Sequence, residues 1–157
     1  MNYWLMKSEP TSYSITDLAR DRETIWDGVR NYQARNFLRS MQCGDRVFFY
    51  HSNAVPPGIV GLAQIVAVNV VDPTQFDGQS KYFDPKSTVE APRWQTVKVA
   101  YQQVFPRLIA LEELKQKFSS EELGVVRSGN RLSVMPVDLA IAQQILALAE
   151  QVKSSLL

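Results

Sequence analysis

The chain has 157 residues, of which 45% are hydrophobic and 21% are charged, and its formal net charge is +1. The length predicts one domain over residues 1–157, and the composition excludes an intrinsically disordered chain. The near-neutral charge excludes a protein that binds nucleic acid through a large basic surface, although it leaves room for a local basic patch.

The scarcity of cysteine and histidine limits the chemistry of the chain. Cys43 is the single cysteine and His51 the single histidine, so we expect no metal site and no internal disulfide. The sequence lacks a phosphate-cradling glycine loop and a serine nucleophile elbow, so we expect no cofactor and no catalytic residue. The N-terminus lacks the features of a signal peptide, and no apolar run reaches the roughly 20 residues that span a bilayer. We therefore expect a cytosolic monomer without membrane contact.

The N-terminal segment predicts a short strand followed by a short helix. Residues 2–6 favour a strand, and Pro10 restricts the residue before it to extended geometry. Ser14 is followed three residues later by Asp17, which is the pattern of a capping box. A helix over residues 15–19 is therefore expected.

A second helix and a second strand follow along the chain. Residues 30–41 predict the helix, and a turn at Gly44 and Asp45 leads into a strand over residues 46–52. The apolar residues of the helix predict its buried side, which consists of Tyr32, Phe37, Leu38 and Met41.

Residues 59–72 predict a strand that is too long to stay straight. At about 3.3 Å per residue it would extend some 46 Å, far beyond the width of a small domain. The strand must therefore bend, and Gly61 is the expected bulge site. A long bent strand is how a small sheet closes into a barrel. The following segment, residues 72–92, contains turn signals and is long enough that we expect it to cover a functional site.

The remaining segments complete an α+β pattern. Residues 94–105 predict a third long strand, residues 109–118 an amphipathic helix, residues 131–135 a short strand and residues 138–151 a C-terminal helix. Strands and helices do not alternate as they do in a βαβ sheet. We therefore predict an α+β fold in which a small β-barrel of five to six strands is flanked by helices.

Polar side chains gather where the predicted strands end, which is where functional sites are usually mounted. They are Lys7, Ser8 and Glu9 after the first strand, His51 and Ser52 after the second, and Ser128, Asn130, Arg131 and Ser133 around the last. Taken singly, such residues are expected to satisfy backbone groups in turns or to be solvated. Taken together, they predict a binding site.

Three tryptophans provide a second signal. Trp4 lies in the first strand and is expected in the core, whereas Trp26 lies in a loop and Trp94 at the start of a strand. Loop-mounted tryptophans beside polar side chains are suited to a pocket for a flat heterocycle, because every nucleobase offers a π-face. Either tryptophan alone favours simple packing, and the pair favours a base pocket.

Several segments, in the same order along the chain, resemble the EVE domain family. They are residues 3–10 (YWLMKSEP), 26–36 (WDGVRNYQARN), 49–52 (FYHS), 82–87 (YFDPKS) and 131–137 (RLSVMPV). The resemblance covers nearly the whole chain. It implies a PUA-like fold and the binding of modified bases in DNA or RNA, such as methylated or hydroxymethylated cytosine.

A more distant resemblance to YTH domains implies roles for single residues. It implies that Trp26 and Trp94 are walls of an aromatic cage and that Arg131 meets a phosphate. The Lys-Ser step of YTH domains is matched by Lys7-Ser8, but the residue that follows is the carboxylate Glu9 where YTH domains carry a neutral polar residue. Adenine specificity therefore does not carry over.

We predict a non-catalytic module that holds a flipped-out modified base between Trp26 and Trp94 and binds the adjoining nucleic acid, DNA or RNA. The predicted base-binding residues are Ser8, Trp26, Asn31, Tyr32, His51, Ser52, Trp94 and Ser133. The predicted phosphate-binding residues are Lys7, Arg35, Ser128 and Arg131. No metal and no cofactor enter this prediction.

Two alternatives stay open. The first is a small amidohydrolase-like enzyme acting on a modified nucleoside, in which Lys7 and Glu9 activate a nucleophile and relay a proton. These two residues share one side of an extended segment, so a salt bridge between them is the simpler expectation. The second alternative is a protein-interaction module, which is favoured only by the neutral charge.

Overall fold

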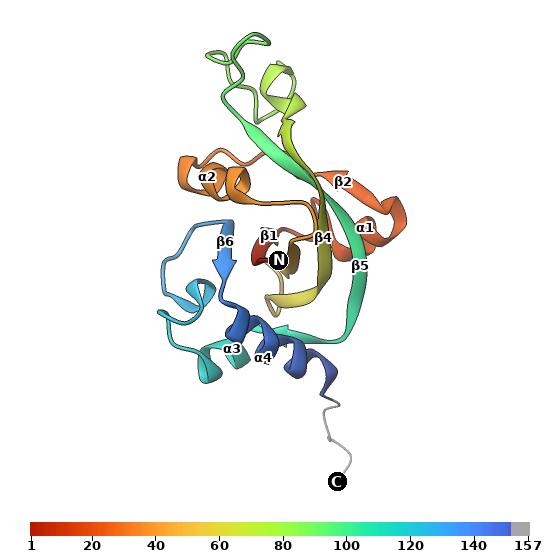
Figure 1. Cartoon of the computed structure of the whole chain (residues 1–157), viewed down its shortest axis with the longest axis vertical. Helices are drawn as coiled ribbons and strands as arrows, with labels where there is room; N and C mark the ends of the chain where they lie inside the picture. Colours follow the sequence, from red (N-terminus) through yellow and green to blue (C-terminus); the bar gives the residue numbers. More distant parts are fainter. Residues whose placement is uncertain (152–157) are drawn as a thin grey trace.

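The computed structural model describes residues 1–151, which form a mixed sheet with helices packed against it (Figure 1). The strands are β1 (Tyr3–Ser8), β2 (Glu23–Ile25), β3 (Arg46–His51), β4 (Gly58–Val71), β5 (Gln95–Ala110) and β6 (Val134–Val137). The helices are α1 (Ile15–Asp21), α2 (Tyr32–Ser40), α3 (Leu111–Lys117) and α4 (Leu139–Glu150), with short 3-10 turns η1 (Pro73–Phe76) and η2 (Gly124–Val126).

The strands form one sheet in the order β2-β5-β4-β3-β1-β6. β1 and β3 run parallel, and the other neighbours run antiparallel. The long strands β4 and β5 lie side by side and bend strongly along their length (Figure 1). The predicted α+β fold with a small, curved sheet of five to six strands and flanking helices is confirmed.

The predicted bend at Gly61 is confirmed. The pairing of β4 shifts register on both sides of this glycine, between Phe49 and Tyr50 on β3 and between Ile59 and Gly61 opposite β5. A Cβ atom at Gly61 would lie 2.5 Å from the carbonyl oxygen of Gln103. A side chain here would therefore separate β4 from β5 at the point where the strand bends.

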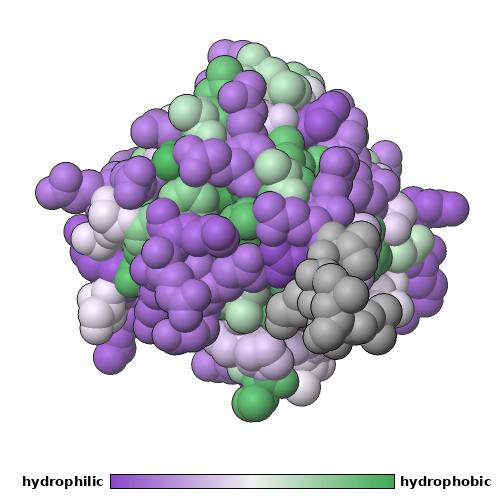
Figure 2. All heavy atoms as spheres, turned by 90° about the horizontal axis from the view of Figure 1, so that it is seen from below, coloured by the Kyte–Doolittle hydropathy of each residue, from purple (hydrophilic) through white to green (hydrophobic). Residues whose placement is uncertain are grey.

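Both faces of the sheet are buried, because successive residues of a strand point to opposite faces. On β1, Tyr3 and Leu5 belong to one core cluster and Trp4 and Met6 to the other. Helices α3 and α4 cover the first cluster, and α1 and α2 cover the second. Seen from below, at the end of the molecule that carries α3 and α4, the surface is mostly hydrophilic (Figure 2).

The local signals of the N-terminal half predicted its elements well. Ser14 caps α1 in a complete capping box with Asp17, as expected. Helix α2 begins two residues later than predicted, because Asn31 caps it by accepting a hydrogen bond from the backbone N–H of Ala34. The prediction that Tyr32 lies on the buried side of this helix is wrong, since 48% of this residue is exposed.

The C-terminal half departs from the prediction at three places. Strand β5 continues to Ala110, so the expected helix over residues 109–118 begins only at Leu111. The strand passes Pro106 because the pairing jumps there, from Val104 opposite Gly61 to Ile109 opposite Ile59, so the missing N–H breaks no ladder bond. Strand β6 starts at Val134 rather than residue 131, and the three-residue β2 was not predicted.

Candidate functional site

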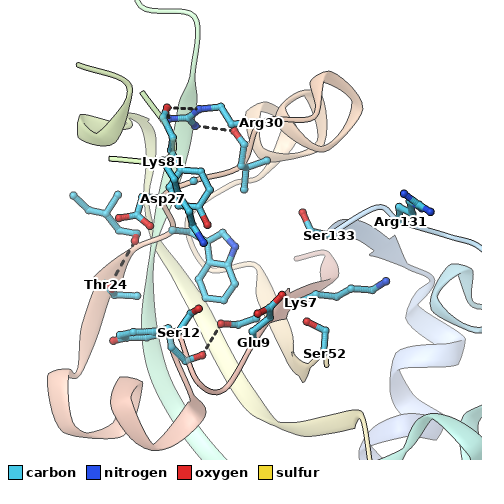
Figure 3. A pocket seen from close by; sticks show the side chains of 17 residues that line it. Lys7, Glu9, Ser12, Thr24, Asp27, Arg30, Ser52, Lys81, Arg131 and Ser133 are labelled. Atoms are coloured by element: carbon cyan, nitrogen blue, oxygen red, sulfur yellow. Dashed lines mark hydrogen bonds between the residues drawn. The ribbon is translucent and has the colours of Figure 1, made fainter. Parts of the chain in front are cut away.

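A cavity of about 720 Å³ opens where several loops meet at the ends of β1, β2 and β3 (Figure 3). Figure 3 shows Lys7 and Arg131 to one side of it and Asp27 and Thr24 to the other. The cavity is lined by Lys7, Ser8, Glu9, Ser12, Tyr13, Thr24, Ile25, Trp26, Asp27, Gly28, Val29, Arg30, Ser52, Lys81, Tyr82, Arg131 and Ser133. The long loop after β4 reaches the cavity through Lys81 and Tyr82, as its length led us to expect.

Half of the predicted site residues lie in this cavity and half do not. Those that line it are Lys7, Ser8, Trp26, Ser52, Arg131 and Ser133. Those that the structure places elsewhere are Asn31, Tyr32, Arg35, His51, Trp94 and Ser128. The strand-end polar residues therefore converge as the sequence suggested, but the second aromatic wall does not.

Trp26 forms a fixed aromatic surface in the cavity. Its backbone N–H donates to the carbonyl oxygen of Val97 at 2.9 Å, and its carbonyl oxygen accepts a hydrogen bond from the hydroxyl of Thr96. Its ring packs edge-on against Phe49, with ring centroids 5.4 Å apart. Within residues 1–151 the indole N–H of Trp26 has no hydrogen-bond acceptor, so it is available to a ligand.

Trp94 lies outside the cavity and serves the fold. Its indole N–H donates to the carboxylate of Asp84 at 2.8 Å. Tyr32 stacks on the ring at 5.0 Å between centroids, and the guanidinium of Arg30 lies 5.1 Å from its centroid. The predicted sandwich of a base between Trp26 and Trp94 is therefore corrected, because neighbouring side chains of the protein already occupy the space beside Trp94.

Arg30 anchors the loop that carries Trp26. Its guanidinium donates to the carboxylate of Asp72 at 3.0 Å, to the hydroxyl of Thr74 and to the carbonyl oxygens of Val29 and Tyr82. Burial alone raises the pKa of Asp72, but hydrogen bonds from Thr74, Gly28 and Arg30 outweigh it and hold this pKa below its usual value. The sequence analysis missed this buried ion pair, since its partners lie far apart in the chain.

A buried glutamine ties the two ends of the long loop together. The side chain of Gln75 is fully buried and donates to the carbonyl oxygens of Asp72 and Trp94. Its amide oxygen accepts from the backbone N–H groups of Arg93 and Trp94 and from the hydroxyl of Ser87. The loop therefore holds Lys81 and Tyr82 at the cavity through internal contacts, a role that its composition alone did not reveal.

Lys7 and Glu9 do not form the expected salt bridge. The ammonium of Lys7 donates to the carbonyl oxygen of Asn130 at 3.3 Å and lies 5.9 Å from the ring centroid of Tyr50. The carboxylate of Glu9 accepts from the side-chain amide of Asn53 at 2.7 Å. Burial lowers the pKa of Lys7. Each side chain is thus held by its own partner.

Two further predicted base-binding residues already have internal partners. The Nε2 atom of His51 accepts a hydrogen bond from the backbone N–H of Ile15 at 3.1 Å, and burial lowers the pKa of this imidazole. The hydroxyl of Ser8 lines the cavity but donates to the carbonyl oxygen of Tyr13 at 2.5 Å. His51 is therefore neutral and holds the start of α1 in place.

Asp27 is a cavity residue that the sequence analysis passed over as a turn signal. Burial raises the pKa of its carboxyl, and the nearby Asp72 adds to the rise. Within the described part of the chain its carboxylate takes part in no ion pair or side-chain hydrogen bond. The adjoining Gly28 has a φ of +83°, and a Cβ atom there would lie 2.6 Å from the ring of Tyr82. Glycine thus lets Tyr82 pack against the loop that presents Asp27 and Trp26.

The site therefore combines one aromatic surface with hydroxyls, one unpaired carboxylate and cations at its edge. Across residues 1–151 no cluster of three or more histidine, cysteine or acidic side chains is placed to hold a metal ion. In the same residues, none of the helices has the length and apolar character needed to cross a membrane. The arrangement suits a flat, polar, uncharged ligand attached to an anionic chain.

Comparisons with known proteins agree on one family. The EVE domain pattern matches residues 2–148. Mouse thymocyte nuclear protein 1 is 45% identical over 95% of this chain and 74% of its own length. A crystal structure from Pseudomonas putida is 52% identical over 94% of this chain and 99% of that one, with a TM-score of 0.90.

Two solved structures of similar proteins contain nucleic acid. Human THYN1 in complex with DNA containing 5-methylcytosine is 39% identical over 97% of this chain and 99% of that one, with a TM-score of 0.88. The YTH domain of the Zygosaccharomyces rouxii MRB1 protein, in complex with N6-methyladenosine RNA, is 16% identical over 99% of this chain and 90% of that one, with a TM-score of 0.55. This last likeness concerns the fold alone.

Proposed function

This chain belongs to the EVE domain family, and on that basis we propose that it binds a modified nucleobase of a nucleic acid in the cavity beside Trp26. The observation that carries the proposal is the pairing, in one cavity, of an aromatic surface with polar groups that have no partner in the protein. A flipped base needs both, because stacking holds it and hydrogen bonds to its edge identify it.

The size of the cavity supports this proposal. Its volume of about 720 Å³ lies within the usual range of small-molecule pockets and leaves room for one base and part of its sugar. The indole of Trp26 supplies a π-face and an N–H donor, and Asp27 supplies an acceptor for an exocyclic amino group. Ser52 and Ser133 add hydroxyls that can donate or accept.

The human relative supports 5-methylcytosine in DNA as the first candidate ligand. Cytosine carries an exocyclic amino donor that a carboxylate can accept from, whereas thymine presents a carbonyl oxygen at the same place. A carboxylate at Asp27 therefore favours cytosine derivatives over thymine. Lys7 and Arg131, at the side of the cavity away from Asp27, are placed to contact adjacent phosphates (Figure 3).

We propose binding without turnover, in preference to an amidohydrolase-like activity. The groups that such an activity would use are already engaged, since Lys7 donates to Asn130, Glu9 accepts from Asn53 and His51 accepts from Ile15. A hydrolytic site would also require a positioned nucleophile and a pair of oxyanion-stabilising donors. The proposal extends to a monomer in the cytosol, which size-exclusion chromatography and localisation of a tagged protein would test.

The test is a binding titration with matched oligonucleotides that carry 5-methylcytosine or cytosine at one position. We expect tighter binding of the methylated oligonucleotide, and we expect Asp27→Ala to remove the preference. Mass analysis of modified nucleosides incubated with excess protein should find no product. Equal affinity for the two oligonucleotides would exclude 5-methylcytosine, and a product that is lost in Lys7→Ala would favour the enzyme instead.

A further inference from the structure

A second cationic surface lies outside the cavity, on the outer side of α2. It consists of Tyr32, Arg35, Arg39 and Arg93, which we call the arginine–tyrosine patch. None of these residues lines the cavity. Tyr32 is 48% exposed although it is a large aromatic residue. The base-binding proposal gives this patch no role.

The positive charge of the patch is only partly balanced. Within residues 1–151, Arg35 and Arg39 have no carboxylate within 4.0 Å, and Arg93 has only Asp84, at 3.7 Å. Burial lowers the pKa of Arg35, and the charges of Arg39 and Arg93 lower it further. Clustered cations without counter-charges attract an anion, because each of them is stabilised when it binds.

The patch is held in place before any ligand arrives. The guanidinium of Arg35 lies 4.7 Å from the ring centroid of Tyr32 and donates to the carbonyl oxygen of Arg93 at 2.8 Å. Arg39 donates twice to the side chain of Gln95, and Arg93 donates to the hydroxyl of Tyr32. Arg35 keeps a buried Nε–H with no acceptor in the described residues. Side chains that are already ordered lose little entropy on binding.

The patch is connected to the cavity through Arg30. Arg30 lines the cavity, and its guanidinium lies 5.1 Å from the ring centroid of Trp94. The opposite neighbour of that ring is Tyr32, at 5.0 Å between centroids. At 3.4 Å per nucleotide along one strand of a duplex, a strand leaving the cavity reaches the patch within about three nucleotides.

We propose that the arginine–tyrosine patch binds backbone phosphates of the same nucleic acid whose modified base enters the cavity. This inference rests on the proposed function, and it assigns the patch to sequence-independent attachment. The cavity would then decide which base is bound, and the patch would fix the direction in which the strand leaves. Arginine is suited to this role because its planar fork of N–H groups matches a phosphate.

The test compares the salt dependence of binding among variants of the full chain. The probes are an unmodified single-stranded oligonucleotide, the same oligonucleotide with one 5-methylcytosine, and free 5-methyldeoxycytidine. In the double variant Arg35→Gln/Arg39→Gln we expect the slope of log K against log salt to become shallower by about 1.4, and affinity at moderate salt to fall on the order of tenfold, for both oligonucleotides alike. Binding of the free nucleoside should not change.

Two further variants guard this result. Arg39→Gln alone removes an exposed side chain whose only described contact is Gln95, so it leaves the fold intact and should shift the slope by about 0.7. Arg20→Gln is the matched control, because this exposed arginine is already paired with Asp17 and Asp21. We expect no change of slope in Arg20→Gln.

Each outcome has one interpretation. An unchanged slope in the double variant, or no binding of any oligonucleotide by the unaltered protein, would overturn the inference. A parallel loss of nucleoside binding would also overturn it, because the patch would then only support the cavity. Failure of the base-binding proposal looks different: the two oligonucleotides would bind equally and the nucleoside not at all, while the patch variants still changed the slope.

Discussion

Trp26 and Trp94 have similar exposure but different surroundings. They are 8% and 6% exposed, and each follows a loop into the same sheet. The indole N–H of Trp94 donates to Asp84, and side chains of the protein contact its ring on both sides. Trp26 packs edge-on against Phe49 and lines a cavity, with no acceptor for its N–H in residues 1–151. Burial alone therefore does not separate a structural tryptophan from a binding one, whereas the state of its polar atom does.

The arginines follow the same rule. All five N–H groups of Arg30 donate within the protein, so this residue has no capacity left for a ligand although it lines the cavity. Arg131 is exposed, also lines the cavity and has no ion pair among the described residues. Two cavity arginines thus have different roles, and the hydrogen bonds they make distinguish them.

The largest expected effect is on stability, at Trp94. Trp94→Ala should lower the free energy of unfolding by about 3–5 kcal/mol, because a buried aromatic ring is lost and Asp84 loses its donor. Urea denaturation followed by circular dichroism would measure it. A stable Trp94→Ala variant that specifically loses preference for the modified base would show that the two tryptophans act together, against our comparison.

The next effect concerns the ion pair of Arg30 and Asp72. Asp72→Asn should lower the free energy of unfolding by about 3 kcal/mol at neutral pH, since it leaves the buried guanidinium without its counter-charge. The folded-state pKa of Asp72 is depressed, so its stabilisation is present above the ordinary carboxyl pKa and disappears as the pH falls through the folded value. The stability difference between the two proteins should therefore shrink in acid. A difference independent of pH would contradict this assignment.

A smaller effect, on binding rather than folding, is expected at Trp26. Trp26→Leu removes the π-face while it keeps an apolar side chain against Phe49. We expect affinity for the modified base to fall by about 1–3 kcal/mol, measured by calorimetry on protein shown to be folded. The control is Trp94→Leu, in which the folded fraction should retain the preference. An unchanged affinity in Trp26→Leu would remove the aromatic surface from the proposed site.

The smallest effect is expected at Asp27, and it has opposite signs for folding and binding. Because the folded-state pKa of Asp27 is raised, its charged form is disfavoured by folding, and this cost grows as the pH rises above the unfolded value. Asp27→Asn should therefore stabilise the protein at neutral pH by about 0.5 kcal/mol and weaken binding of the modified base. The affinity of the unaltered protein should fall in acid as the carboxylate is protonated. Destabilisation by Asp27→Asn would identify a structural carboxylate.

The elements with strong local signals could be predicted from the sequence. The capping box at Ser14 and the bend at Gly61 depend on neighbouring residues and on steric limits, so each follows from a short segment. Strand β5 could not be bounded in this way, because Pro106 falls in a pairing irregularity that exists only once β4 lies beside it.

The candidate site was predictable only in part. The polar residues that follow parallel β1 and β3 converge because parallel strands end at the same edge, which brings Ser8 and Ser52 together. The role of Trp94 depends on Tyr32 and Asp84, which are brought to it by the folded loop and by α2. Likewise, no spacing rule connects Arg30 to Asp72. Contacts between distant segments decided which candidates became structural.

The most direct measurement is the response of the two indole N–H groups to a modified base in solution. In NMR spectra of the full chain, with resonances assigned through single Trp→Phe variants, an oligonucleotide containing 5-methylcytosine should shift the Trp26 indole resonance and leave that of Trp94 in place. The matched cytosine oligonucleotide should shift Trp26 much less. A response at Trp94 with none at Trp26 would contradict the assignment of the cavity beside Trp26 as the base-binding site.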